Sequence, residues 1–171
     1  AADLLSSVDK VFSAGWKSIK LYFMIGLPHE EENDLAGIID LGYQALRASR
    51  HRGQVTISLS TFVPKPHTPF QWEKQLSLDE TYARQQFIRQ RLNNRNLSVK
   101  WHDARMSLLE GLRSRGDERI GGLLLLAWQK GCRFDGWSEI LRFDLWQEAI
   151  RETGINVDDY LRERSTTETL P

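Results

Sequence analysis

Cysteine is almost missing from this chain of 171 residues, in which Cys132 is the only one. A lone thiol excludes an internal disulfide framework and any metal site built from several cysteines of this chain. Free cysteines are usually buried and behave as small apolar side chains. We therefore interpret Cys132 as a structural thiol on an apolar helix.

An excess of either charge is also missing, because 23 Lys and Arg residues balance 23 Asp and Glu residues. A net charge of zero gives no bulk attraction to nucleic acid or to an acidic membrane, so nucleic-acid binding is not favoured. The longest apolar run, Leu123–Trp128, is far shorter than the roughly 20 residues of a membrane span. No segment at the N-terminus resembles a signal peptide. These absences predict a cytoplasmic protein without a membrane partner.

The sequence also lacks a pattern of residues spaced to bind a metal ion. The histidines form neither a His-Glu-x-x-His motif nor any other paired spacing. They are His29, His51, His67 and His102. We predict no metal site and assign no side chain a catalytic role. The chain starts without Met, at Ala1 and within a helical pattern, so we interpret it as a segment of a longer protein.

Apolar residues are plentiful, at 40% of the chain with six tryptophans, which is enough for one sizeable core or two small ones. Ile19–Ile25 is a nearly unbroken apolar run, as expected of a parallel strand covered on both faces. Gln54–Val63 alternates apolar residues with Ser and Thr, which is typical of a strand with one small, polar face. The apolar stripe within Glu31–Ser49 predicts a helix between these strands.

Strand, helix and strand form a βαβ unit, for which we expect parallel strands and a right-handed crossover. The polar strand face suits the inside of an α/β barrel, where sites form at the C-terminal ends of strands. Two loops follow such ends: Gly26–Glu30, and a stiff segment containing Pro64, Pro66 and Pro69. Glycine and proline let the backbone approach a ligand closely and stay rigid, although Gly-Leu-Pro after a strand is by itself more often only a turn.

The pattern changes towards the C-terminus. Leu78–Asn94 predicts a helix and Leu97–Trp101 a short final strand. Three further helices are then expected over Asp103–Leu112, Arg119–Lys130 and Phe143–Thr153. We therefore predict an α/β part over residues 1–101 and a helical appendage over residues 102–171.

Three segments together resemble the radical S-adenosylmethionine (SAM) superfamily. KLYFMIGLPHEEENDLAGIIDLGYQAL is similar to the fifth strand, loop and helix of its barrel. ISLSTFVPKPHTPFQW is similar to the sixth strand and proline loop of the methylthiotransferase branch. The segment from Asp103 to Ile150 resembles the region after the barrel in an uncharacterised radical SAM family with an N-terminal cobalamin-binding-type domain. The resemblance, from about Val8 to Leu161, implies the C-terminal portion of a (β/α) partial TIM barrel followed by a mainly helical region.

The same resemblance implies a SAM site at the two strand ends. The adenine-binding positions of the superfamily correspond to Met24, Ile25, Gly26, Leu27 and Pro28, and the neighbouring wall to Phe62, Val63 and Pro64. Glu30 matches the glutamate of the usual Gly-Glu-Thr, whereas His29 and Glu31 depart from its glycine and threonine. Candidates for substrate contact are Ser60, Lys65 and His67.

Radical SAM chemistry needs a 4Fe-4S cluster held by a Cys-x3-Cys-x2-Cys loop, which this chain lacks. The resemblance therefore implies an enzyme whose cluster and remaining SAM contacts belong to the rest of the barrel and the N-terminal domain of a parent protein. Cobalamin is a candidate second cofactor of that parent, and the substrate is unidentified. This chain alone is expected to be inactive. The alternative is a non-catalytic module that binds a protein or an RNA through its loops and helical tail.

Overall fold

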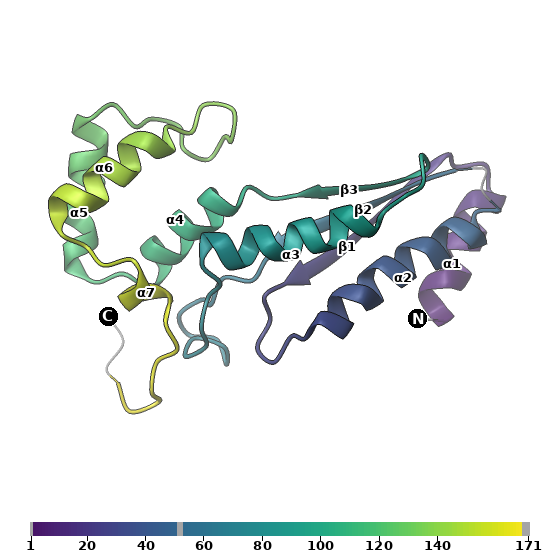
Figure 1. Ribbon diagram of the computed structural model, residues 1–171, viewed down its shortest axis with the longest axis horizontal. Helices are drawn as coiled ribbons and strands as arrows, with labels where there is room; N and C mark the ends of the chain where they lie inside the picture. The colour runs from purple at the N-terminus through teal and green to yellow at the C-terminus, as the bar shows by residue number, and fades with distance from the viewer. Residues whose placement is uncertain (1, 51–52, 169–171) are drawn as a thin grey trace. The chain divides into compact units, whose positions relative to one another are not determined.

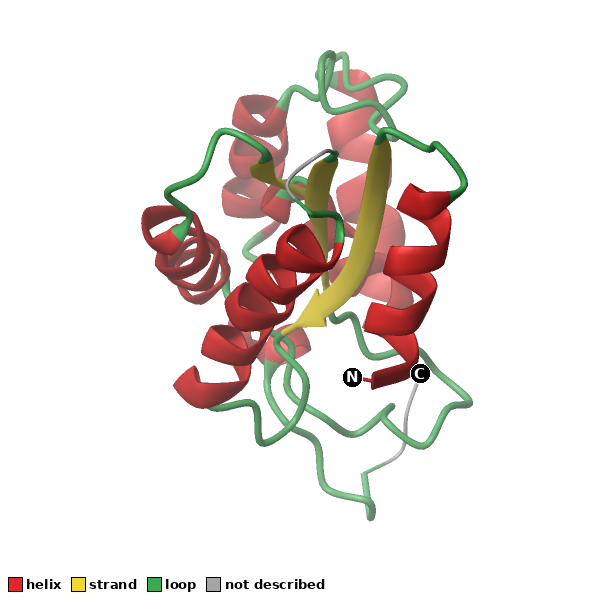
Figure 2. Cartoon of the chain, turned by 90° about the vertical axis from the view of Figure 1, so that its right-hand side faces the viewer, coloured by secondary structure: helices red, strands yellow, loops and turns green. Residues whose placement is uncertain are grey.

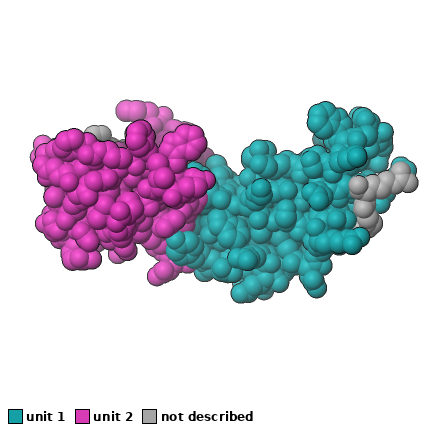
Figure 3. Space-filling model, turned by 90° about the horizontal axis from the view of Figure 1, so that it is seen from above, with its two compact units in different colours: residues 1–61, 80–102 teal, residues 62–79, 103–171 magenta. Residues whose placement is uncertain are grey.

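The computed structural model describes residues 2–50 and 53–168. These residues form a mixed α/β fold with a three-stranded parallel sheet and seven helices (Figure 1). The expectation of an α/β protein is confirmed, and the partial barrel stays a prediction. The chain divides into two compact units, coloured separately in Figure 3. Unit 1 consists of residues 1–61 and 80–102, and unit 2 of residues 62–79 and 103–171.

The proline-rich segment 62–79 belongs to the same compact unit as the helices after residue 102. The sequence assigned this segment to the α/β part, because it directly follows a strand. The chain therefore enters unit 2 twice. The predicted division of the chain into an α/β part over residues 1–101 and a helical appendage over residues 102–171 stays a prediction.

Unit 1 is built on strands β1 (Ser18–Ile25), β2 (Gln54–Thr61) and β3 (Leu97–Trp101). The strands lie side by side in this order, drawn in yellow in Figure 2. Both pairs are parallel, with Ser18 opposite Gln54 and Val55 opposite Leu97. Parallel pairing of β1 and β2 across a helical connection confirms the predicted βαβ arrangement.

One face of this sheet packs against three helices, α1 (Ala2–Ser13), α2 (Glu32–Ala48) and α3 (Leu78–Arg91). The strands contribute Leu21, Val55 and Ile57 to this core, and the helices contribute residues such as Leu46 and Ile88. Side chains alternate between the two faces of a strand, so the core residues of β1 and β2 occupy every second position. In β2, the packed face is the apolar one of the two faces that the alternating sequence predicts.

The opposite face, here called the open sheet face, contains Lys20, Tyr22, Met24, Thr56, Ser58, Ser60, Ser98 and Lys100. Tyr22 is 76% exposed and Met24 is 46% exposed. The small, polar face predicted for β2 is confirmed. The prediction that Ile19–Ile25 is covered on both faces is wrong for the described chain. Only alternate residues of this apolar run enter the core, and the others are exposed.

Unit 2 contains α4 (Ala104–Arg115), α5 (Glu118–Gln129), α6 (Phe143–Thr153) and the short α7 (Asp158–Leu161). Asp103 and Asp117 cap α4 and α5, and each accepts a hydrogen bond from the backbone N–H two residues later, at 2.9 and 3.0 Å. The three helices predicted in this region are confirmed. Four residues are too few for a periodic pattern, so α7 was not predicted. Among residues 2–50 and 53–168, no helix is both long and apolar enough to cross a membrane.

Arg115 fastens the proline-rich segment within unit 2. This residue is only 4% exposed, and its guanidinium donates to the carbonyl of Glu73 and, at 2.8 Å, to the carbonyl of Arg162. Burial, followed by the positive charges of Arg164 and Arg162, lowers the pKa of Arg115 to about 10. Arg115 therefore stays charged at neutral pH. It reinforces two segments that backbone hydrogen bonds also join, from Gln75 N–H to the Leu161 carbonyl and from Arg164 N–H to the Trp72 carbonyl, both at 2.8 Å.

Candidate functional site at the strand ends

The first half of the predicted site lies where β1 and β2 end. Ile25, the last residue of β1, is opposite Thr61, the last residue of β2. The loop that begins at Gly26 therefore starts at the same edge of the sheet as the segment that begins at Phe62. In parallel α/β folds this C-terminal edge is the one at which ligands bind.

The loop after β1 is fixed by Glu30. Gly26 has a φ of +83°, in the left-handed region that favours glycine. Its N–H donates to Oε2 of Glu30 at 2.8 Å, and Oε1 of Glu30 accepts from Nε of Arg84 in α3 at 2.8 Å. The Glu30 side chain is 7% exposed, so this ion pair is largely shielded from water. The Glu30 carboxylate thus stabilises the loop, because it connects the backbone of Gly26 to Arg84 of α3.

Sequence reasoning matched Glu30 to the family motif but missed Arg84, which lies 54 residues away in the chain. A pocket of about 250 Å³ lies beside the pair and is lined by Glu30, Glu31, Glu32, Leu35, Ala83, Arg84 and Phe87. The only sequence signal for this contact is a cationic residue on a helix near the loop. Helix α3 contains several arginines, and each is an equally good candidate partner of Glu30. The sequence alone did not distinguish them.

The five residues predicted to contact adenine differ in what they expose. The side chains of Met24 and Leu27 are 46% and 41% exposed, whereas Ile25 is fully buried in the core of unit 1. Gly26 is buried and Pro28 is half-buried. Ile25 can therefore meet a ligand only through its backbone. Met24 and Leu27 are the two side chains of this group that are open to an apolar partner.

The second predicted group lies in unit 2. Phe62 is 6% exposed and packs edge-to-face on Phe70, with ring centroids 5.7 Å apart. Pro64 is fully buried and Val63 is half-buried. Phe62 and Pro64 are thus buried side chains of the proline-rich segment, and neither is open to a ligand.

The three candidates for substrate contact are all exposed. Ser60, at the end of the open sheet face, donates from its hydroxyl to the carbonyl of Phe23 at 3.3 Å. Lys65, in unit 2, forms an ion pair with Glu110 and donates to Ser114 Oγ at 3.2 Å. His67 has a φ of +61°, and its N–H donates to the side chain of Gln71 at 3.0 Å. Lys65 is thus engaged by α4, while the imidazole of His67 is open.

The residues of this chain do not fit an iron-sulfur cluster. Cys132 is buried, as predicted, but it follows α5 instead of lying on a helix. Burial, with Asp135 and Asp144 adding to it, raises the pKa of the Cys132 thiol. Across the part of the chain that the structure describes, no three His, Cys, Asp or Glu residues are grouped to hold a metal ion. His51 lies outside the described residues.

The end of β1 and the loop after it have an exposed apolar surface. Met24 and Leu27 offer exposed apolar side chains on either side of a glycine, which has no side chain to obstruct a planar ring. Thr61 at the same edge is 8% exposed, and its hydroxyl has no hydrogen-bond partner among the described residues. This hydroxyl is enclosed on the face of β2 that packs against the helices, so it does not add to the exposed surface of Met24 and Leu27.

Comparison with known proteins gives one relative. An uncharacterized protein of Methanocaldococcus jannaschii is 28% identical over 123 residues, which cover 71% of this chain and 26% of that protein. The matched region thus spans about a quarter of the relative's length. No family model matches the chain, and no solved structure matches it.

Proposed function

We propose that this chain is the C-terminal part of a radical SAM enzyme and that β1, β2 and β3 are the last strands of its barrel. The open sheet face carries the proposal, because its β2 part is small and polar, and no helix of unit 1 covers it. All-parallel sheets occur almost only with both faces covered. A barrel completed by further strands of the parent protein would turn this face inwards and cover it.

The free edge of β1 supports the same proposal. Within the described residues β1 pairs only with β2, so the other edge of this eight-residue strand has unpaired backbone groups. Such an edge favours pairing with another strand. We infer that earlier strands of the parent pair with β1. The archaeal relative, of which the match covers 26%, has ample length outside the matched region for such strands.

In a radical SAM enzyme, the cluster supplies the electron that cleaves SAM into methionine and a 5'-deoxyadenosyl radical. This chain offers no cluster ligands, so its own contribution is to bind and orient SAM. The exposed side chains of Met24 and Leu27 would hold the adenine, and Gly26 would let the backbone approach it. Glu30 is a positioning residue, because it fixes the loop that carries Gly26 and Leu27. Cobalamin in the parent and a cytoplasmic location stay predictions.

SAM affinity of the parent protein, measured by isothermal titration, tests this site. Met24→Asp places a charge against the adenine and should weaken SAM binding about tenfold. Met24→Leu keeps an apolar side chain of similar volume and should bind SAM like the wild type. An unchanged affinity in Met24→Asp would remove Met24 from the SAM site. A parent reading frame without Cys-x3-Cys-x2-Cys within about 150 residues upstream, roughly one domain length, would refute the proposal as a whole.

A non-catalytic protein- or RNA-binding module is the second candidate function. Exposed apolar side chains in unit 2 favour a protein partner, since such surfaces commonly mark interfaces. They include Leu125 at 56%, Trp128 at 56%, Phe134 at 75% and Trp137 at 66% exposure. Size-exclusion chromatography of the isolated chain separates the two functions. A clean monomer favours the binding module, whereas association through the free edge of β1 favours the incomplete barrel.

A further inference from the structure

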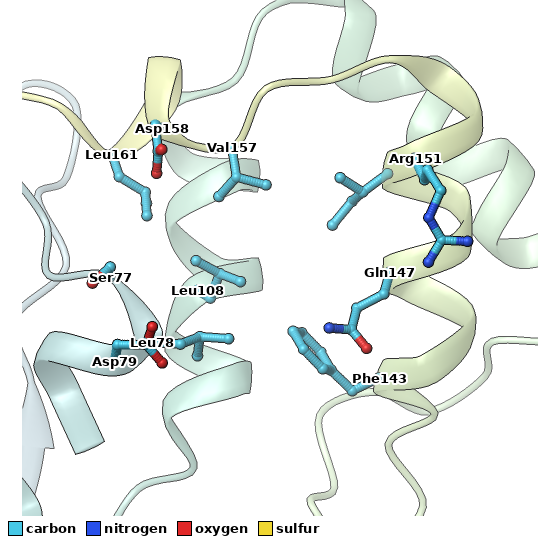
Figure 4. A pocket seen from close by; sticks show the side chains of 11 residues that line it. Ser77, Leu78, Asp79, Leu108, Phe143, Gln147, Arg151, Val157, Asp158 and Leu161 are labelled. Carbon is cyan, nitrogen blue, oxygen red and sulfur yellow. The ribbon is translucent and has the colours of Figure 1, made fainter. Parts of the chain in front are cut away.

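Unit 2 contains a pocket whose lining includes none of the residues predicted from the sequence to bind SAM or substrate. Its volume is about 460 Å³, within the range of about 300–1,000 Å³ that is common for small-molecule sites. The pocket lies among the first residues of α3, the middle of α4, α6 and α7 (Figure 4). These residues all belong to the same compact unit, so the pocket is a feature of unit 2 itself.

The interior of the pocket is apolar. Leu108 and Leu161 are 7% and 3% exposed, and Phe143, Ile150 and Val157 are half-buried around them. Figure 4 shows the side chains of Leu108 and Phe143 directed into the same space. This lining would take up an apolar group of a ligand and remove it from water.

Charged side chains lie around the apolar lining. Arg151 comes from α6, whereas Asp79 and Asp158 come from the start of α3 and from α7 on the opposite wall (Figure 4). All three are exposed residues. Their side chains form no ion pair or hydrogen bond with any described residue. A positive wall and a negative wall thus face each other across an apolar space, and the protein leaves both without a partner.

We propose that this pocket binds a short zwitterionic peptide or a molecule of the same chemistry, with a carboxylate at one end, an ammonium group at the other and an apolar body between them. The carboxylate would pair with Arg151, whose planar guanidinium suits it, and the ammonium group would lie near Asp79 and Asp158. The apolar body would contact Leu108 and Phe143. This site goes beyond the proposed SAM function, because it uses none of the strand-end residues.

Three forms of one dipeptide test the proposal with the wild-type chain. The probes are leucyl-phenylalanine, its N-acetyl form and its C-terminal amide, titrated into the isotope-labelled chain and followed by NMR chemical shifts. The unblocked dipeptide should bind, with the largest shifts at residues of α6 and α7. Acetylation removes the positive charge and amidation removes the negative charge, so each should weaken binding about threefold to tenfold.

Charge-removing variants should remove the same effects selectively. Arg151→Gln should bind the unblocked dipeptide as weakly as the wild type binds the amide. Its affinity for the amide should equal that of the wild type, because the amide has no carboxylate to lose. Asp158→Asn should bind the unblocked dipeptide as weakly as the wild type binds the acetylated form, and should bind the acetylated form with the affinity of the wild type. The controls Arg47→Gln and Asp40→Asn change exposed residues of α2 in unit 1 and should alter no affinity. Circular dichroism of each variant checks the fold.

Absence of binding by the unblocked dipeptide would overturn the proposal. Equal affinity for all three forms would also overturn it, because the charged walls would then play no part. That second comparison needs no substitution, so it stands even if a variant fails to fold. Shifts confined to unit 1 would place binding elsewhere and would equally contradict the pocket.

Discussion

Glu30 uses both carboxylate oxygens, one for the N–H of Gly26 and the other for Arg84. Hydrogen bonds to charged groups contribute about 1.5–3 kcal/mol when water is largely excluded. The Glu30 side chain meets that condition better than the Arg84 side chain, which is 26% exposed. The shape of the loop that carries Gly26 and Leu27 therefore depends on one carboxylate behind it.

Glu30→Ala should lower the free energy of unfolding by about 1.5–3 kcal/mol, because it leaves Nε of Arg84 and the Gly26 N–H without their acceptor. Glu32→Ala is the matched control at the first residue of α2, where a side chain that is 74% exposed lies 4.0 Å from Arg91. Its effect should stay below about 1 kcal/mol. Urea denaturation of both variants measures the difference. Equal losses would show that the Glu30 network adds nothing beyond an ordinary surface pair.

Asp117 makes the stability of unit 2 depend on pH. Hydrogen bonding by Arg119 is the main cause that lowers the pKa of Asp117 from 3.8 to about 2, and Tyr160 also donates to this carboxylate at 3.2 Å. A pKa lower in the folded than in the unfolded state stabilises the fold above the unfolded value. That contribution is lost as the pH falls from about 3.8 towards 2.

Asp117→Asn keeps an oxygen that can cap α5 but removes the charge. The wild type should therefore melt at a higher temperature than the variant above pH 4, and the gap should close as the pH falls towards about 2. Thermal unfolding between these pH values measures the gap. Asp40→Asn, at an exposed position of α2, is the control and should give no such trend. A gap that is constant with pH would show that the Asp117 charge does not contribute.

At the scale of elements, consecutive residues of β2 face opposite sides of the sheet, one packed against helices and the other open. Ile57 is fully buried and its Cδ1 would lie 2.7 Å from a Cβ added at Gly42, so α2 approaches β2 closely at a residue without a side chain. Ser58, the next residue, belongs to the open sheet face and pairs with Tyr22 across the strands. The sheet is thus stabilised from one side only.

Ile57→Ala should lower the free energy of unfolding by about 2–5 kcal/mol, because it removes buried methyl groups and leaves a cavity. Ser58→Ala is the control on the other face and should change it by less than about 0.5 kcal/mol. Chemical denaturation of both variants tests the assignment of faces. A large loss in Ser58→Ala would mean that the open sheet face is covered in the isolated chain.

The elements of this fold were largely predictable because their signals are local. The alternation in β2, the apolar stripe of α2 and the position of Asp103 at the start of α4 each lie within a few residues of what they determine. Contacts between distant segments were not predictable. The Glu30–Arg84 pair and the bond from Arg115 to Arg162 join residues 54 and 47 positions apart, and no periodicity records such a pairing. The pocket of unit 2 was missed for the same reason.

At the scale of the whole molecule, two features of the sheet support the proposal that further strands of a longer protein accompany it. All-parallel sheets usually have both faces covered, and the free edge of β1 favours pairing with another strand. The strand-end residues offer SAM two exposed apolar side chains, and the chain holds no cluster ligands. We infer that the activity belongs to the parent protein, in which unit 1 would form one wall of the SAM site.

Anaerobic iron-sulfur reconstitution of the full-length parent, followed by incubation with SAM and a reductant, tests this account most directly. We predict that the reconstituted protein binds a 4Fe-4S cluster and converts SAM into methionine and 5'-deoxyadenosine, and that Met24→Asp weakens this conversion while Met24→Leu does not. A correctly folded parent that binds no cluster, or that binds one and leaves SAM intact, would contradict the account.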